Sequence, residues 1–300
     1  MVPDKLWVVD RRTTRRYLLF RPDKQRHIEN AFWYCLGVCA NEVSLEVHAA
    51  TLMSTHTHLV YSDPQGLQPD FKREFHRTFA CCVKAILGWP EEVLRSNSAG
   101  GEHEPANEEA LVSDIGHLIA NPVAAFAVRY AKDWPGAKTV ASDIGTRVIT
   151  ATRPDFYFSP RNTRWPDKVE LRLTMPEALV AKYGEQGARD RIAEEVKRRE
   201  HQAWDEAKAG GIAFKGARRV QRTAHTARAR RYEVFGKVNP RFSAAGDAET
   251  AAAKLSELKQ FDADYDQALA RWMSGDRQAV FPYGTWWMRV HHRVRVRPPP

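Results

Sequence analysis

The spacing of apolar and polar residues in the first 135 positions switches between the period of a strand and that of a helix. Residues 43–49 alternate apolar and polar side chains, as a half-buried strand does. Residues 24–41 and 71–87 repeat apolar side chains every three or four positions, which predicts amphipathic helices. Strands are also expected over 15–20 and 51–61, and a flexible polar loop over 91–109. A short helix is expected over 109–120. Asn121-Pro122 should interrupt it, and a second helix should follow over 123–130.

The composition changes after Trp134-Pro135-Gly136. Residues 169–174 alternate like a strand, whereas residues 176–209 and 248–274 have the pattern of long helices. The order strand–helix–strand–strand–helix–helix predicts an α+β domain over residues 1–140, with a mainly antiparallel sheet covered by helices on one face. Residues 141–300 are expected to form a basic, mainly helical C-terminal extension.

Composition restricts the kind of protein. Hydrophobic residues make up 43% of the 300 positions and the mean hydropathy is −0.54. No apolar run approaches the roughly 20 residues that span a bilayer, and the N-terminus lacks the charged-then-apolar layout of a signal peptide. We therefore expect a cytoplasmic protein with no membrane contact. The four cysteines form no CxxC pair, so we expect free thiols rather than a zinc ribbon.

The net charge of +9 predicts a polyanionic partner, and its distribution is more specific than its size. No acidic residue lies between Glu206 and Glu233, and the chain ends in a second acid-free stretch. Such stretches suit contacts to DNA phosphates, although a solvated helix face has the same appearance. The basic residues that crowd together in the first stretch are Lys215, Arg218, Arg219, Arg222, Arg228, Arg230 and Arg231; those near the end of the second are Arg289, Arg293, Arg295 and Arg297.

Two adjacent tryptophans, Trp286 and Trp287, lie in the second acid-free stretch. They are either stacking surfaces for the bases of a single strand or part of a small core.

The stretch Met53-Ser-Thr-His-Thr-His-Leu-Val-Tyr61 carries the main candidate chemistry. His56 and His58 are two positions apart on an expected strand, so both imidazoles project from one face. Two adjacent imidazoles can bind one divalent metal ion, which can polarise a phosphodiester oxygen. The alternative is a pair of surface histidines on an amphipathic strand.

Several short blocks, taken together with their order along the chain, resemble the single-tyrosine HUH transposases, including the REP-associated tyrosine transposases. One block is the histidine stretch itself, which departs mildly from the family by having Thr57 between the two histidines. The other matching blocks are Arg15-Arg-Tyr-Leu-Leu-Phe-Arg-Pro-Asp23, Asn121-Pro-Val-Ala-Ala125, Trp134-Pro-Gly136 and Phe281-Pro-Tyr-Gly-Thr-Trp286.

This resemblance implies a ferredoxin- or RRM-like HUH fold, and a site in which His56, His58 and Asn121 hold Mg²⁺ or Mn²⁺. It also implies DNA as the partner, single-stranded or folded into a hairpin, and a homodimer. In the family a tyrosine attacks the scissile phosphate and remains covalently attached to the DNA. Asn121 has a second interpretation, as the cap of a helix that begins at Pro122.

The tyrosine of the family is missing from its expected position. In the REP-associated branch it lies four residues before the asparagine, where this chain has His117, and no tyrosine occurs between Tyr61 and Tyr130. Three interpretations stay open: a degenerate enzyme that still binds DNA, His117 as a substitute nucleophile, or another tyrosine such as Tyr130 or Tyr17.

Two functions from different classes therefore remain. The first is a DNA-binding protein of the HUH endonuclease and transposase class with impaired or altered strand cleavage. The second is a non-catalytic nucleic-acid-binding protein, regulatory or domesticated, that reuses the fold. An unrelated metal-dependent hydrolase is disfavoured, because no carboxylate-rich motif accompanies the histidines.

Overall fold

A five-stranded sheet forms the centre of the computed structural model, which describes residues 4–94, 101–229 and 240–298. The strand order is β2-β3-β1-β4-β7. Three of the four strand pairs are antiparallel, and only the short β4–β7 pair is parallel. The expected α+β class with a mainly antiparallel sheet is therefore confirmed. The strands are β1 (Lys5–Arg12), β2 (Glu46–Met53), β3 (His56–Asp63), β4 (Glu102–Pro105) and β7 (Phe242–Ser243).

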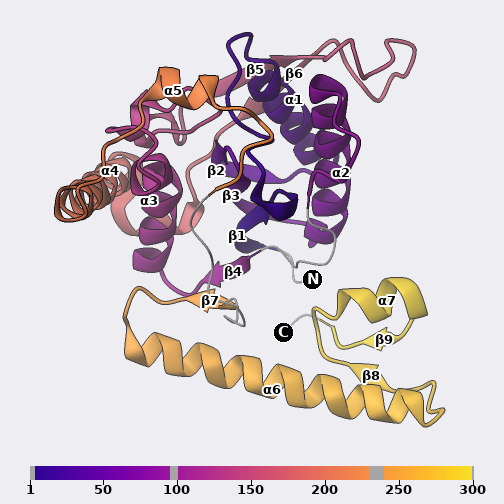
Figure 1. Cartoon of the computed structure of the whole chain (residues 1–300). Coiled ribbons are helices and arrows are strands. Elements are labelled where there is room, and N and C mark those ends of the chain that lie inside the picture. The colour runs from indigo at the N-terminus through magenta and orange to yellow at the C-terminus, as the bar shows by residue number, and fades with distance from the viewer. Residues whose placement is uncertain (1–3, 95–100, 230–239, 299–300) are drawn as a thin grey trace.

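Helices cover both faces of the sheet, which makes three layers (Figure 1). Helices α1 and α2 pack on one face, where Val9 and Leu59 join their core. Helices α3 and α4 pack on the other face, against Val8 and Val60. The expectation of helices on one face only is wrong, because successive strand residues point to opposite faces and these strands are apolar on both. The helices are α1 (His27–Glu42), α2 (Gln68–Leu87), α3 (Glu108–Ala124) and α4 (Glu177–Ala209).

Two aspartates fix where the helices of the first face begin. The Asp23 carboxylate accepts the backbone N–H groups of His27 and Ile28 at 3.0 and 2.9 Å, at the start of α1. The Asp63 carboxylate, at the end of β3, accepts the N–H of Gln68 at 2.7 Å, where α2 begins. Helix starts carry backbone donors without an intrahelical acceptor, and these carboxylates supply one.

Residues 15–20, expected as a strand, form an irregular segment instead. It starts in a single 3-10 turn at residues 14–16. Phe20 is fully buried, and its backbone N–H donates to the Ser54 carbonyl at 3.0 Å, beside the turn that leads into β3. The apolar side chains here serve packing rather than strand pairing, and the strand of this region, β1, lies directly before them.

The polar segment 91–109, expected as a flexible loop, contains β4. Its sequence, Glu-His-Glu-Pro, offers no apolar side chain that would predict a strand. The strand forms because β1 and β7 supply backbone partners on its two sides.

Helix α3 passes through Pro122 and ends at Ala124. The expected interruption at Asn121-Pro122 and the expected helix over 123–130 are therefore both wrong. A proline near the end of a helix removes one backbone hydrogen bond but does not have to interrupt the helix. The Ala125 N–H still bonds to the Asn121 carbonyl at 2.9 Å, so the helical pattern continues past the proline.

Residues beyond 140 pack on the same core as those before it. The hairpin of β5 (Val148–Thr152) and β6 (Lys168–Arg172) places Ile149 and Leu171 in the core under α1. The expected strand near 169–174 and helix over 176–209 are confirmed by β6 and α4. The division of the chain at residue 140 stays a prediction.

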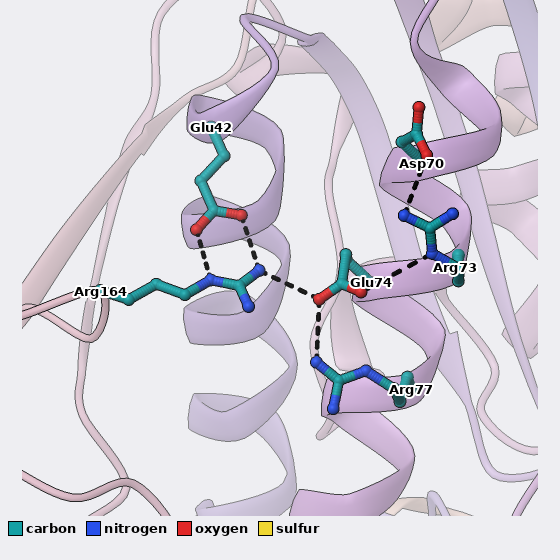
Figure 2. A network of polar contacts seen from close by, with 6 residues as sticks. All are labelled: Glu42, Asp70, Arg73, Glu74, Arg77 and Arg164. Carbon is teal, nitrogen blue, oxygen red and sulfur yellow. Dashed lines mark hydrogen bonds and ion pairs between the residues drawn. The ribbon is translucent and has the colours of Figure 1, made fainter. Parts of the chain in front are cut away.

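An ionic network ties the loop after β5 to α1 and α2 (Figure 2). The Arg164 guanidinium donates to both carboxylate oxygens of Glu42, at 2.7 and 2.9 Å, and to Glu74 at 3.1 Å. Arg77 also bonds to Glu74, at 2.9 Å. Bidentate arginine–carboxylate geometry is the strongest form of such a pair, so this loop is held against the two helices.

The C-terminal residues form a small helical unit along the β4–β7 edge of the sheet (Figure 1). The Lys254 ammonium lies 3.0 Å from the Glu104 carboxylate, which joins this unit to β4. Its own core contains Phe281, Met288 and Val294. The elements of the unit are α6 (Ala248–Met273), β8 (Val280–Phe281), α7 (Trp286–His292) and β9 (Arg295–Val296).

The cysteines and the helix lengths were also subjects of the sequence analysis. All four cysteines are free, as expected. Among the helices that the structure describes, none has the length and apolar character needed to cross a membrane.

Candidate active site

Strand β3 places His56 and His58 on the sheet face that α3 and α4 cover. The two residues share this face with Val60, which packs in the core under α3. Their ring centroids lie 4.5 Å apart, so the imidazoles are in contact. In the neighbouring strand β1, Arg12 pairs with His56 and Asp10 pairs with His58.

Helix α3 brings His117 and Asn121 to the same place. The His117 ring lies 5.9 Å from the His58 ring, centroid to centroid. One helical turn later, the Asn121 amide nitrogen lies 3.4 Å from His117 Nε2, and the Asn121 side chain also hydrogen-bonds to His56. The spacing of four residues puts His117 and Asn121 on one helix face, over the histidine pair. The structure thus brings these four side chains together.

The two histidines are half-buried as whole residues, but their rings are shielded from water and are held neutral. Burial, and then the nearby Arg12 charge, lower the pKa of His56 to about 3. Burial, and then the neighbouring His56, lower the pKa of His58 well below its usual value. A neutral imidazole keeps one nitrogen lone pair, which is the form that binds a metal ion.

His58 has an unsatisfied nitrogen. Its Nε2 atom is buried and has no hydrogen-bond partner among the described residues. Buried polar atoms nearly always have a partner, so an orphan calls for a ligand or another explanation. Two neutral imidazoles and the Asn121 amide oxygen make a donor set of two nitrogens and one oxygen.

This donor set fits Mg²⁺ or Mn²⁺ only in part. Hard cations prefer carboxylates and other oxygens, and in the part of the chain that the structure describes no group of three or more His, Cys, Asp or Glu side chains could hold a metal ion. Mn²⁺ also accepts imidazole, so the set fits Mn²⁺ better than Mg²⁺.

Two arginines near the site were not recognised from the sequence. Arg12 lies close enough to lower the pKa of both histidines, and its register opposite His56 becomes visible only once the sheet is paired. Arg199 of α4 donates to the Ser113 hydroxyl at 2.9 Å and approaches His117 Nδ1 at 3.4 Å. Nothing in the charged sequence of α4 distinguishes Arg199 from its neighbours.

His117 is at the open edge of the site. Its side chain stays exposed, while partial desolvation and then the Arg199 charge lower its pKa. It is therefore a neutral base in reach of solvent, held between Arg199 and Asn121.

The two alternative tyrosines are engaged elsewhere. The Tyr130 ring meets the Trp204 ring of α4 edge-on at 5.3 Å. The Tyr17 hydroxyl accepts a hydrogen bond from Arg228 at 2.7 Å, and this bond is the main reason that the pKa of Tyr17 is lowered. Among the described contacts, neither ring touches His56 or His58.

The basic segment packs beside the site. Helix α5 (Ala217–Arg222) buries Val220 against Met53, directly before the turn that leads to the histidines. Further along, the Arg228 guanidinium lies over the Tyr17 ring at 4.6 Å. The exposed basic side chains of this segment are Lys215, Arg218, Arg219, Arg222 and Arg228, whereas Arg230 and Arg231 lie outside the described residues.

Comparisons with known proteins give one similarity. No protein-family model and no curated protein matches the sequence. A solved structure of a REP-associated tyrosine transposase bound to a REP hairpin is similar over 47% of this chain and 80% of that chain, with 18% sequence identity and a TM-score of 0.39. At this level of similarity the function has to be judged on the residues of this chain.

Proposed function

We propose that this chain is a DNA-binding, transposase-like protein of the HUH class, with strand cleavage impaired or altered. The observation that carries the proposal is the meeting of His56, His58, His117 and Asn121, with His58 Nε2 buried and unpartnered. Strand spacing had singled out His56 and His58, and the family resemblance had singled out His117 and Asn121 in a separate segment.

His56, His58 and Asn121 are the proposed ligands of Mn²⁺ or Mg²⁺. A bound ion supplies the polarisation of a phosphodiester oxygen. The protein's own part is to hold two imidazoles neutral and to keep them in contact at 4.5 Å.

Single-stranded or hairpin DNA is the proposed partner, and the chain is proposed to act as a homodimer. Arg218, Arg219 and Arg222 project from α5 into solvent, with no ion pair to other described residues. Helix α5 packs directly beside the turn into β3. A DNA strand whose phosphates bind to α5 would therefore also pass the histidines. Exposed arginines next to a candidate phosphodiester site support DNA over other polyanions.

The second candidate is a binding protein without cleavage chemistry. The observation that favours it is that no tyrosine among the described residues contacts the site: His117 occupies the helix position, and Tyr17 and Tyr130 are bound to other side chains. Arg12 would also stabilise a phosphate there in place of a metal ion.

One pair of measurements tests the proposal. Binding of Mn²⁺ is measured by calorimetry, and binding of a labelled hairpin with a single-stranded flank by anisotropy. We expect wild type to bind both, and His58→Ala to lose Mn²⁺ affinity at least tenfold. The matched control is His27→Ala, which removes an exposed histidine outside the site and should leave both affinities unchanged.

The outcomes separate the candidates. DNA binding together with equal Mn²⁺ affinities for wild type and His58→Ala would favour the non-catalytic binder. Absence of DNA binding by wild type would overturn both.

A further inference from the structure

The short helix α7 presents an apolar face to solvent. Trp287 is 60% exposed and Val290 is 48% exposed. Both point outward because Met288, between them, is buried in the small core of the C-terminal unit with Phe281. Positions three and four apart share a helix face, so Trp287, Val290 and His291 lie together on the outside.

The rings of this face form a continuous surface. The His291 ring packs on the Trp287 ring at 3.9 Å between centroids, with an angle of 37° between the planes. The Trp286 ring adjoins both, 6.3 Å from Trp287 and 5.7 Å from His291. Trp287 and His291 are exposed, and Trp286 is half-buried beside them. Lone exposed apolar side chains are common, but adjoining rings that reach solvent mark an interaction surface.

Positive charge surrounds these rings. Residues 277–300 contain no aspartate or glutamate. Arg295 bonds to Gln278 at 2.6 Å and Arg297 to Asp264 at 2.7 Å. Arg289 and Arg293 are exposed and have no ion pair with any of the residues described, so their charge is available to a partner.

We propose that Trp286, Trp287, Arg289, His291 and Arg293, the α7 platform, bind single-stranded nucleic acid. An unpaired base stacks on the rings and the adjoining phosphates bind the two arginines. Bases inside a duplex are already stacked on one another, so a flat exposed ring favours an unpaired strand. A helix of seven residues has too little apolar area to bind a membrane firmly by insertion.

The platform is separate from the histidine site. It lies in the C-terminal unit, whereas the histidines lie between the sheet and α3 (Figure 1). The proposal therefore deepens the proposed function, on which its choice of partner rests, by adding a second binding surface whose residues the histidine site does not use.

The test uses the full chain and a labelled oligothymidylate of about 15 nucleotides, a length near the largest site sizes of single-strand binders. Stacking contributes about 1–3 kcal/mol per base. We therefore expect Trp287→Ala to weaken binding about tenfold, and Trp287→Phe, which keeps a ring, to weaken it much less. Met273→Ala removes an exposed apolar side chain at the end of α6 and is the matched control, with unchanged affinity.

A second arm isolates the bases and the charges. An abasic oligomer of equal length should bind wild type about as weakly as oligothymidylate binds Trp287→Ala. Combined Arg289→Gln and Arg293→Gln should lower the slope of log affinity against log salt by about 1.4, because each phosphate contact on a single strand contributes about 0.7.

These results would overturn the proposal: equal affinities of wild type and Trp287→Ala for oligothymidylate, or equal affinities of wild type for the thymidylate and abasic oligomers. Binding to phosphatidylserine vesicles that depends on Trp287, without an effect on the oligonucleotide, would assign the platform to lipid. All arms are repeated in His58→Ala, so that failure of the histidine site cannot imitate failure of the platform.

Discussion

At the scale of single residues, the surroundings of His58 have the largest chemical consequence. A buried polar atom without a partner costs about 1–3 kcal/mol. The Nε2 atom of His58 carries this cost beside a second neutral imidazole and an amide. A ligand shared by these groups would recover it. The unpartnered nitrogen together with a second neutral imidazole and the Asn121 amide, rather than any one of these features alone, favours a site over a pair of structural histidines.

His117 decides which chemistry that site can perform. An imidazole is shorter than a phenol and ends in nitrogen, so its reach and its pKa both differ from those of tyrosine. Catalysis needs the nucleophile about 3 Å from the phosphorus and in line with the leaving oxygen. The register of α3 fixes where this side chain starts, one turn before Asn121.

Restoring the hydroxyl is the sharpest test at this scale. We expect wild type to form no covalent adduct with a hairpin-containing single strand in Mn²⁺, and His117→Tyr to form one. Denaturing gels followed by mass spectrometry measure the adduct and its position.

His117→Phe is the matched control, because it has the ring without the hydroxyl, and it should form no adduct. A metal-dependent adduct in wild type, mapped to a tyrosine, would contradict this prediction and would direct attention to Tyr17 or Tyr130.

At the scale of elements, α5 combines anchoring with an exposed charge. Val220 is buried against Val128 and Trp134, and the Arg21 guanidinium bonds to the Gln221 carbonyl at 2.7 Å. The helix is therefore part of the folded body, and deleting it would expose a core. Its arginines can be substituted without this damage, because their side chains are in solvent.

We expect Arg218→Gln, Arg219→Gln and Arg222→Gln together to weaken binding of all hairpin sequences alike. Each phosphate contact contributes about 0.7 to 0.9 to the salt slope, so the slope should fall by about 2 to 3. Anisotropy titrations over a range of salt concentrations measure it.

The matched control changes three exposed basic residues of α4, Arg191, Lys197 and Lys208, to glutamine. These three substitutions remove the same net charge from a helix outside the α5 surface, and the salt slope should then stay close to that of wild type. Salt slopes that match between the α5 variant and wild type would show α5 to be a solvated face.

At the scale of the whole molecule, histidines buried in neutral form link stability to pH. His48 is fully buried in β2, where its ring nitrogens bond to the Thr174 carbonyl at 3.0 Å and the Ser62 hydroxyl at 2.8 Å. Burial lowers the pKa of His48 to about 4. The unfolded chain binds a proton near pH 6.5, where the folded chain does not.

The sign follows from this difference. Stability from His48 is complete above pH 6.5 and is lost as the pH falls toward 4, by about 3 kcal/mol in all. We expect His48→Gln, which cannot be protonated, to lower the slope of unfolding free energy against pH in this window by about 1.4 kcal/mol per pH unit. Urea unfolding at a series of pH values measures the slope.

His27→Gln changes an exposed histidine and should leave the slope as in wild type. An unchanged slope in His48→Gln would mean that His48 already takes up its proton in the folded state. A change in absolute stability in either variant does not affect this comparison, which concerns the slope alone.

The sequence by itself determined the α+β class, the long helices and the histidine pair. Helices such as α1 and α4 follow from local periodicity, which is written in consecutive residues. The shared face of His56 and His58 follows from the alternation of a strand, and that of His117 and Asn121 from the helical repeat. Each of these inferences needs only neighbours along the chain.

Tertiary structure decided what depends on distant partners. β4 is a strand only because β1 and β7 offer backbone groups to a polar segment. The helices cover both faces because the sheet is apolar on both, and α3 survives Pro122 because packing outweighs one lost hydrogen bond. Arg12 and Arg199 reach the site through strand pairing and helix packing across many residues, which no local pattern records.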